Sequence, residues 1–205
     1  MNTGAEPLRT VRWGMIGCGS VTERKSGPAF YKVPGSALVA VMGRRAEAVR
    51  DYAQRHGIAR WYTDAQALID DSEVDAVYIA TPPDSHYAYS LQVAAAGKHC
   101  CVEKPMALHA GQSLAMQQAF EQAGLHLFVS YYRRSLPRFA QVRQWLADGR
   151  IGEVRHLHWS LSKAASEADR SGAANWRTDP QVAGGGYFAD LASHGLDLFL
   201  SLIHI

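Results

Sequence analysis

The chain has 205 residues, a length between one and two ordinary domains. Hydrophobic residues make up 47% of it and charged residues 20%, so it can bury a core of useful size and is not disordered throughout. The 21 Lys and Arg residues nearly balance the 19 Asp and Glu residues, giving a net charge of +2. This balance excludes a strongly electrostatic binder, and we expect neither nucleic acid nor membrane as a partner.

Residues 1–10 lack the apolar stretch of a signal peptide, and no apolar run in the chain is long enough to span a bilayer. Cys18, Cys100 and Cys101 include an adjacent pair and do not have the spacing of metal ligands. We therefore expect residues 1–10 to be a leader, the thiols to be reduced, the protein to be cytoplasmic, and no metal to be bound.

Short apolar runs alternate with amphipathic stretches over residues 11–130. The runs are apolar on both faces, which is typical of strands covered by helices on both sides. Strands are predicted at residues 11–16, 37–42, 76–80, 99–102 and 125–129, with a further short one around Trp61. Helices are predicted at residues 45–56, 64–70, 85–96 and 111–123, with Asp64 and Ser85 as N-caps and Gly57, Gly97 and Gly124 as stops. This alternation predicts an α/β fold with a doubly wound parallel sheet, the Rossmann architecture.

The pattern changes after the last of these strands. A helix is predicted at residues 139–148, and the alternation over residues 154–162 indicates an antiparallel strand with one covered face. Residues 163–180 are predicted to be a long loop, and residues 187–202 an apolar helix. Because one strand and two helices cannot close a sheet-based domain, we interpret residues 131–205 as a truncated second domain.

A glycine-rich turn, GCGSVT at residues 17–22, follows the first predicted strand and opens a helix. The first glycine permits a tight turn, the second lets a pyrophosphate approach the backbone, and the helix start offers N–H groups to the anion. The third position of this fingerprint is usually Gly or Ala, and here it is Thr22. The alternative interpretation of the motif is an ordinary strand-to-helix turn. The candidate dinucleotide-binding residues here are Gly17, Gly19, Ser20, Val21 and Thr22.

The end of the second predicted strand carries arginines where an NAD site usually has an acid for the ribose hydroxyl. Arg44 and Arg45 follow Gly43, and guanidinium groups match a phosphate. We therefore predict NADP in preference to NAD, recognised mainly by Arg44, with NAD as a possible cofactor. The alternative is that both arginines are solvated residues at a helix start.

The fourth predicted strand is followed by Thr81 and Pro82, which end it sharply at the edge where open α/β sheets bind ligands. We take both as cofactor-binding candidates. His86 has two interpretations that the sequence does not separate, a cofactor contact or an exposed residue in the first turn of a helix.

After the fifth predicted strand stands Glu103-Lys104-Pro105. Together with the glycine turn, Thr81-Pro82 and the series Gly184–Gly186, Asp190 and His194, it resembles the Gfo/Idh/MocA oxidoreductase family over most of the chain. The resemblance implies a Rossmann domain followed by an α+β domain built on an open mixed sheet, here incomplete. It also implies hydride transfer between NAD(P) and a carbonyl or hydroxyl carbon of a sugar, polyol or related small metabolite. Relatives of this kind are often homo-oligomers, so we expect one for a full-length form.

The three central residues suit this chemistry. Lys104 lies just beyond a strand end, where a positive group orients the substrate oxygen and stabilises a developing oxyanion. Asp190 and His194 are four residues apart on a predicted helix and share one face. His194 is the candidate acid and base, because a histidine gains and loses a proton near neutral pH, and Asp190 orients it or the substrate. Glu103 is expected to support Lys104. Both residues are also cofactor-binding candidates, because Lys104 can orient the cofactor ribose as well as the substrate oxygen.

Two further residues precede the glycine run. Trp176 and Arg177 match a pattern also seen in the family, and we expect them to line the substrate pocket. A tryptophan that only packs against its neighbours is the alternative.

Two other functions compete with the oxidoreductase. One is a non-catalytic dinucleotide-binding protein, such as a redox sensor. The retained Lys104, Asp190 and His194 argue against it, because a sensor needs none of them. The other is a lyase or hydrolase that uses tightly bound NAD as an internal oxidant, and the preference expected from Arg44 argues mildly against that.

The family's proteins are substantially longer than this chain, and its last six residues, LSLIHI at 200–205, match one reading frame of a transposase adapter used in DNA library preparation. We expect the reading frame to have run into adapter, so that these six residues are not biological. We also expect the chain as written to have little dehydrogenase activity, because part of the substrate pocket is missing.

Overall fold

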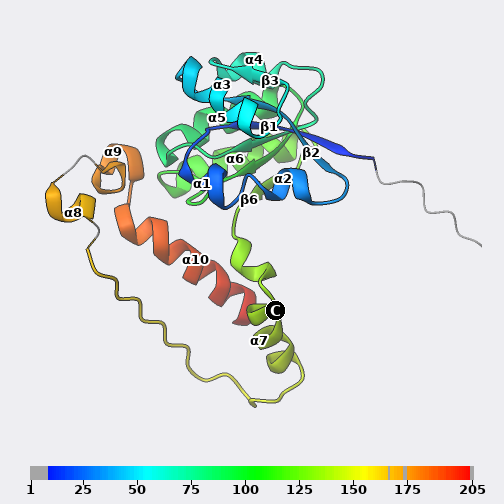
Figure 1. The fold of residues 1–205 in the computed structure, drawn as a ribbon. Helices are drawn as coiled ribbons and strands as arrows, with labels where there is room; N and C mark the ends of the chain where they lie inside the picture. Colours follow the sequence, from blue (N-terminus) through cyan, green and yellow to red (C-terminus); the bar gives the residue numbers. More distant parts are fainter. Residues whose placement is uncertain (1–8, 166, 173–174, 204–205) are drawn as a thin grey trace, which may run out of the picture. The chain divides into compact units, whose positions relative to one another are not determined.

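The computed structural model describes residues 9–165, 167–172 and 175–203 (Figure 1). Within it the chain divides into two compact units between Val129 and Ser130. Residues 204–205, part of the expected adapter-derived end, lie outside the described residues.

The first unit is built on six parallel strands in the order β3-β2-β1-β4-β5-β6. Their bounds are β1 Val11–Ile16, β2 Ser36–Met42, β3 Arg60–Tyr62, β4 Ala76–Ile79, β5 His99–Val102 and β6 Leu127–Val129. This is the strand order of a dinucleotide-binding doubly wound sheet. It confirms the predicted parallel sheet, including the short strand around Trp61.

The helices between the strands are α1 Ser20–Arg24, α2 Ala29–Lys32, α3 Ala46–Arg55, α4 Ala65–Ile69, α5 His86–Ala95 and α6 Ala110–Gln122, with a 3-10 turn at Pro83–Ser85. Asp64 caps α4, because its carboxylate accepts the Ala67 N–H at 2.9 Å. Ser85 occupies the N-cap position of α5, as predicted, but its side chain makes no capping hydrogen bond. Its hydroxyl instead donates to the Pro82 carbonyl at 2.9 Å, within the 3-10 turn that runs directly into α5.

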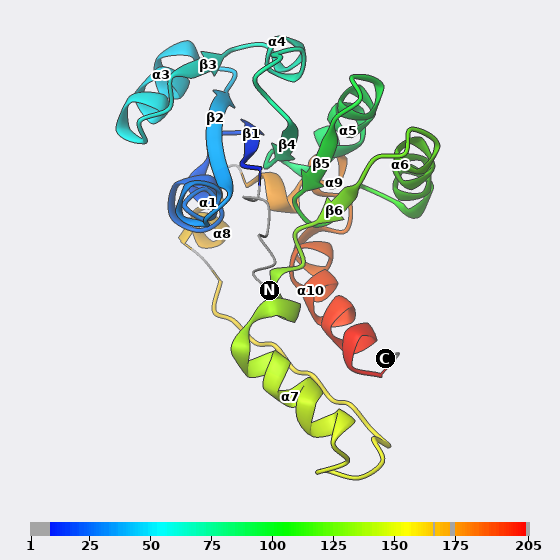
Figure 2. The ribbon, with the colours of Figure 1, turned by 90° about the vertical axis from the view of Figure 1, so that its right-hand side faces the viewer.

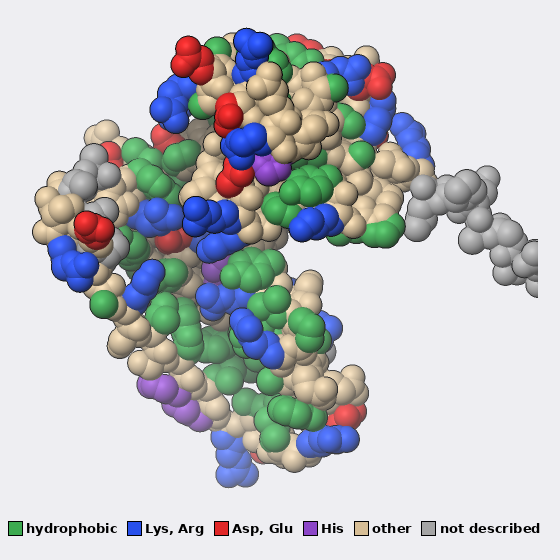
Figure 3. Space-filling view, in the orientation of Figure 1, with side chains coloured by type: hydrophobic (Ala, Val, Ile, Leu, Met, Phe, Trp, Pro, Cys, Tyr) green, Lys and Arg blue, Asp and Glu red, His purple; other side chains and the backbone are tan. Residues whose placement is uncertain are grey.

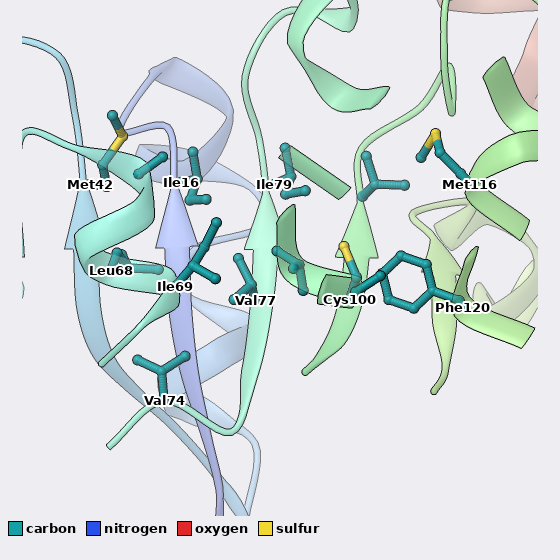
Figure 4. Close-up of a cluster of buried hydrophobic side chains, with 14 of the residues drawn as sticks. Ile16, Met42, Leu68, Ile69, Val74, Val77, Ile79, Cys100, Met116 and Phe120 are labelled. Atoms are coloured by element: carbon teal, nitrogen blue, oxygen red, sulfur yellow. The ribbon is translucent and has the colours of Figure 1, made fainter. Parts of the chain in front are cut away.

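Alternate residues of the strands enter two separate cores, one on each face of the sheet. Met15, Val41 and Tyr78 pack with α3, whereas their chain neighbours Ile16 and Ile79 pack with α4, α5 and α6. Figure 2 shows α1 on one side of the sheet and α5 and α6 on the other, and Figure 4 shows the second core. Because both faces are covered, the central strands consist mostly of apolar residues, which is the pattern that the sequence displays.

An ion pair joins β1 to β4 at the amino-terminal end of the sheet. Arg12 donates from Nε to Asp75 Oδ2 at 3.0 Å and from Nη2 to Oδ1 at 2.7 Å, and its backbone N–H donates to Oδ2 at 2.9 Å. These bonds favour the charged carboxylate and lower the pKa of Asp75 to about 2.

We expect Asp75→Asn to lower the free energy of unfolding at pH 7 by about 1–2 kcal/mol, since the native carboxylate is bound more tightly than the unfolded one. A pKa depressed in the folded state contributes stability above the ordinary carboxyl pKa, and this contribution disappears as the pH falls towards 2. Urea unfolding of both proteins at pH 7 and near pH 2 measures the difference, with the exposed Asp84→Asn as control. A difference that persisted at low pH would contradict the assignment.

The second unit contains α7 Pro137–Ala147, α8 Glu167–Ser171, α9 Pro180–Ala183 and α10 Gly186–Ile203, with 3-10 turns at Tyr132–Ser135 and Trp176–Thr178. The helices predicted at 139–148 and 187–202 correspond to α7 and α10. The prediction of one long loop at 163–180 was incomplete. The described part of this segment contains α8 and the second 3-10 turn.

The strand predicted at 154–162 was wrong. These residues make no strand pairing with any part of the chain that the structure describes, and their segment runs along the surface (Figure 3). Several of their apolar side chains are exposed. Leu161, for example, is 52% exposed. A strand needs a neighbour to take its backbone N–H and C=O groups, and alternation of residue types does not supply one. The described part of this unit therefore has no sheet.

Candidate functional site

The glycine loop begins where β1 ends. Gly17 has a φ of +105°, a conformation that side-chain-bearing residues rarely adopt, and its N–H donates to the Met42 carbonyl of β2 at 2.9 Å. A Cβ on Gly17 would lie 2.8 Å from the Ala80 carbonyl oxygen. The loop is therefore pressed against the end of β4, and glycine is required at this position by the fold itself.

Gly19 is not constrained in this way by the surrounding protein. It is exposed, and a Cβ placed on it would meet no atom within 4 Å. Ser20, also exposed, begins α1 immediately afterwards. An open backbone cradle after the first strand of a doubly wound sheet fits the pyrophosphate of a dinucleotide, which needs the space that a Cβ would fill. Val21 is half-buried beside it.

Thr22 is the last residue of the predicted glycine turn, and its side chain belongs to the protein interior. The side chain is fully buried, and its hydroxyl is 2.9 Å from the Gly19 carbonyl and 3.3 Å from the Gly17 carbonyl. The Thr22 carbonyl in turn accepts the Tyr52 hydroxyl at 3.1 Å. Threonine is tolerated at the third position of the fingerprint because it satisfies the carbonyls of the loop itself and holds the turn closed.

Arg44 and Arg45 are exposed just after β2, at the carboxyl edge of the sheet. Arg45 occupies the N-cap position of α3, and its side chain makes no capping hydrogen bond. The arginines lie where the second strand of a dinucleotide-binding sheet presents its specificity residue.

Thr81-Pro82 follows β4, and Glu103-Lys104-Pro105 follows the adjacent β5, so both segments lie at the same carboxyl edge. Glu103 accepts the Tyr78 hydroxyl at 2.6 Å through Oε1, and its Oε2 is 3.2 Å from the Lys104 backbone nitrogen. Burial and the Glu103 carboxylate raise the pKa of Tyr78, which keeps the phenol a donor. The Lys104–Pro105 peptide bond is cis.

His86 is not the exposed residue that one interpretation predicted. It is fully buried, with Nε2 2.8 Å from the Thr81 carbonyl and Nδ1 2.9 Å from the Pro105 carbonyl. Both ring nitrogens already face protein oxygens, so the ring offers neither of them to a cofactor. The sequence did not separate the alternatives because the second partner lies 19 residues away.

The second unit brings together three of the predicted substrate-binding residues. Arg177 Nε is 3.1 Å from Asp190 Oδ2, and the guanidinium lies over the Trp176 ring at 4.4 Å from its centroid. Trp176 therefore packs against the arginine that contacts Asp190.

His194 is 5% exposed on α10, with the rings of Tyr131 and Tyr132 set edge-on to it at centroid distances of 6.1 and 5.0 Å. One residue on the same helix face escaped the sequence reasoning. Asp197 is buried and accepts Arg134 Nε at 2.7 Å and Nη2 at 2.5 Å. Its position, seven residues after Asp190 and three after His194, was the available signal, because those spacings share one face.

Lys104 belongs to the first unit, whereas Asp190 and His194 belong to the second. Their meeting around one substrate is part of the proposal below. No group of His, Cys, Asp and Glu suited to hold a metal ion occurs among the described residues. Within the same part of the chain, every helix is too short or too polar to cross a membrane.

Comparison with known proteins identifies the family. Residues 11–131 match the family described as "Oxidoreductase family, NAD-binding Rossmann fold", and residues 139–204 match "GFO/IDH/MocA C-terminal domain". Oxidoreductase P35 of Formosa agariphila is 43% identical over 189 residues, which are 92% of this chain and 59% of that protein. The chain spans about half the length of the curated relatives it matches.

Solved structures agree. The aldose-aldose oxidoreductase from Caulobacter crescentus, solved with glycerol, is 28% identical with a TM-score of 0.82, over 95% of this chain and 58% of that one. The 3-ketoreductase KijD10 from Actinomadura kijaniata, solved with NADP and TDP-benzene, is 29% identical with a TM-score of 0.67, over 72% and 45%. With the family match covering more than half of the sequence, the chain belongs to the Gfo/Idh/MocA family of oxidoreductases.

Proposed function

We propose that the protein is an NAD(P)-dependent oxidoreductase acting on a carbonyl or hydroxyl carbon of a sugar, polyol or related small metabolite. The observation that carries the proposal is the open cradle at Gly19, at the same sheet edge as the firmly held Glu103-Lys104-Pro105 segment. The sugar-processing relatives support the substrate class. We further propose that the protein is cytoplasmic and that its full-length form is a homo-oligomer.

The dinucleotide, when bound, supplies the hydride donor or acceptor. The backbone of residues 17–22 would hold its pyrophosphate, and Thr81 and Pro82 would be further cofactor-binding residues. Lys104 places its ammonium at the reacting substrate oxygen, where it stabilises developing negative charge. His194 gives or takes the proton of that oxygen, and Asp190, held by Arg177, orients the substrate or the imidazole.

Gly19→Ala tests the cradle. We expect NADPH affinity to fall by about 10- to 100-fold, since the new methyl group would occupy the space of the pyrophosphate. Each tenfold loss of affinity corresponds to about 1.4 kcal/mol of binding free energy. The midpoint of thermal unfolding should hardly change, because the methyl group meets no protein atom within 4 Å. Isothermal titration and a thermal melt on the same samples give both quantities. Unchanged NADPH binding would contradict the site and with it the proposed function.

The finer proposal is that NADP is preferred, with Arg44 as the principal phosphate ligand and Arg45 beside it. We expect Arg44→Ser to weaken NADPH binding by about 10- to 100-fold, the effect of losing a charged hydrogen-bonding pair, and to leave NADH binding unchanged. Arg50→Ser, an exposed change on α3, is the matched control. Equal affinity of the unmodified protein for NADPH and NADH would refute the preference.

A further inference from the structure

His86 connects two loops that carry the proposed chemistry. Its buried ring lies between the Thr81 carbonyl, two residues after β4, and the Pro105 carbonyl, next to Lys104. It is also the first residue of α5, so the ring is anchored on a helix that packs on the sheet. The ring therefore contacts the loops that follow two adjacent strands, and it does so from a rigid element.

The contacts define what the ring must do. Carbonyl oxygens only accept hydrogen bonds, so each contact needs a proton on the ring nitrogen that faces it. Burial lowers the pKa of His86, and a neutral ring donates from one nitrogen at a time, whereas a protonated ring donates from both. In a neutral ring, a proton on Nδ1 allows a hydrogen bond to the Pro105 carbonyl, and a proton on Nε2 allows one to the Thr81 carbonyl.

Lys104 lies between two attachments. On one side Glu103 accepts the Tyr78 hydroxyl at 2.6 Å, and on the other Pro105 faces His86 at 2.9 Å. A catalytic side chain retains its place only when the backbone that carries it is fixed, because small displacements cost large factors in rate.

We propose that His86 is a positioning residue for Lys104, donating from Nδ1 to the Pro105 carbonyl and so fixing the backbone from which the lysine extends. The role that Lys104 then performs rests on the proposed function, but its placement is a property of the chain and is measurable without substrate or cofactor.

Two substitutions separate the contacts. The amide nitrogen of asparagine falls close to the Nδ1 position of histidine and that of glutamine close to the Nε2 position, and each amide nitrogen is a donor. His86→Asn therefore retains a donor for Pro105, whereas His86→Gln retains one for Thr81. Both remove the same buried ring, so a merely structural role affects them alike.

The readout is the NMR signal of Lys104 after reductive ¹³C-methylation of the five lysines of the whole chain, assigned by Lys104→Arg. We expect His86→Asn to retain the chemical shift and relaxation of the unmodified protein, and His86→Gln to shift the Lys104 signal and narrow it. In the full gene product, kcat should fall about 10- to 100-fold in His86→Gln and much less in His86→Asn, with KM little changed in both. Equal effects of the two variants, or none, would overturn the proposal.

The unmodified chain provides a test that does not depend on how the variants fold. A ¹⁵N spectrum of the His86 ring must show a proton on Nδ1, and a ring protonated on Nε2 alone overturns the proposal. NADPH titration of the same sample is scored separately. Failure to bind NADPH contradicts the proposed function, while the Lys104 and His86 signals still decide the positioning.

Discussion

Lys104→Met in the full gene product is expected to lower kcat by about 10²- to 10⁴-fold, the range found when a positioned proton-transfer or oxyanion-stabilising group is removed. Methionine retains an unbranched apolar chain and loses the ammonium, so it removes charge and hydrogen bonding with little change in shape. NADPH affinity should change far less than kcat, because the cradle at Gly19 is a separate part of the site.

Stopped-flow or steady-state turnover with a panel of aldoses and polyols, followed at the reduced-nicotinamide absorbance band, measures this effect. Lys32→Met, an exposed change on α2, is the matched control and should retain full turnover. If Lys104→Met turned over at the unmodified rate, Lys104 would have no part in the chemistry. Loss of NADPH binding equal to the loss in kcat would instead make it a cofactor ligand.

Gly17→Ala is expected to lower the free energy of unfolding of the first unit by about 3 kcal/mol. The positive φ of Gly17 is costly for a residue with a side chain, by an amount on the order of 1–3 kcal/mol. The new Cβ would also lie 2.8 Å from the Ala80 carbonyl oxygen, which is backbone and cannot rotate away.

Urea unfolding followed by far-ultraviolet circular dichroism measures this loss. Gly19→Ala is the control within the same loop, since its Cβ has open space and its φ of −109° suits any residue. The two variants should therefore show opposite behaviour, one losing stability and the other losing ligand affinity. Equal unfolding midpoints for Gly17→Ala and the unmodified protein would show that the loop adapts without cost.

The sheet of the first unit was predictable because its central strands are apolar on both faces and because α3, α5 and α6 end just before Gly57, Gly97 and Gly124. The absence of a strand at 154–162 was not predictable. Alternation of apolar and polar residues is a property of one segment, whereas strand pairing requires a second segment beside it. The positions of Thr22 and His86 were equally hidden. Their burial depends on residues brought near by the fold, and the sequence shows only that a hydroxyl and an imidazole are present.

The candidate site residues also divide into those that a local motif indicates and those that depend on a distant partner. Gly17, Lys104 and Asp190 could be proposed as site residues from the sequence because their motifs have fixed spacing. Asp197 was missed although its helical spacing from Asp190 was visible, because its partner Arg134 lies 63 residues away. The direct contact between Arg177 and Asp190 also required the structure.

Arg45 occupies the N-cap of α3 without capping it. Aspartate at an N-cap typically stabilises a helix by about 1 kcal/mol, and an acid after the second strand is also what selects NAD. On the proposed function, replacing Arg45 by aspartate would therefore stabilise α3 and would also reverse the charge beside the proposed phosphate site. Helix stability and the proposed preference for NADP place opposite demands on this one position.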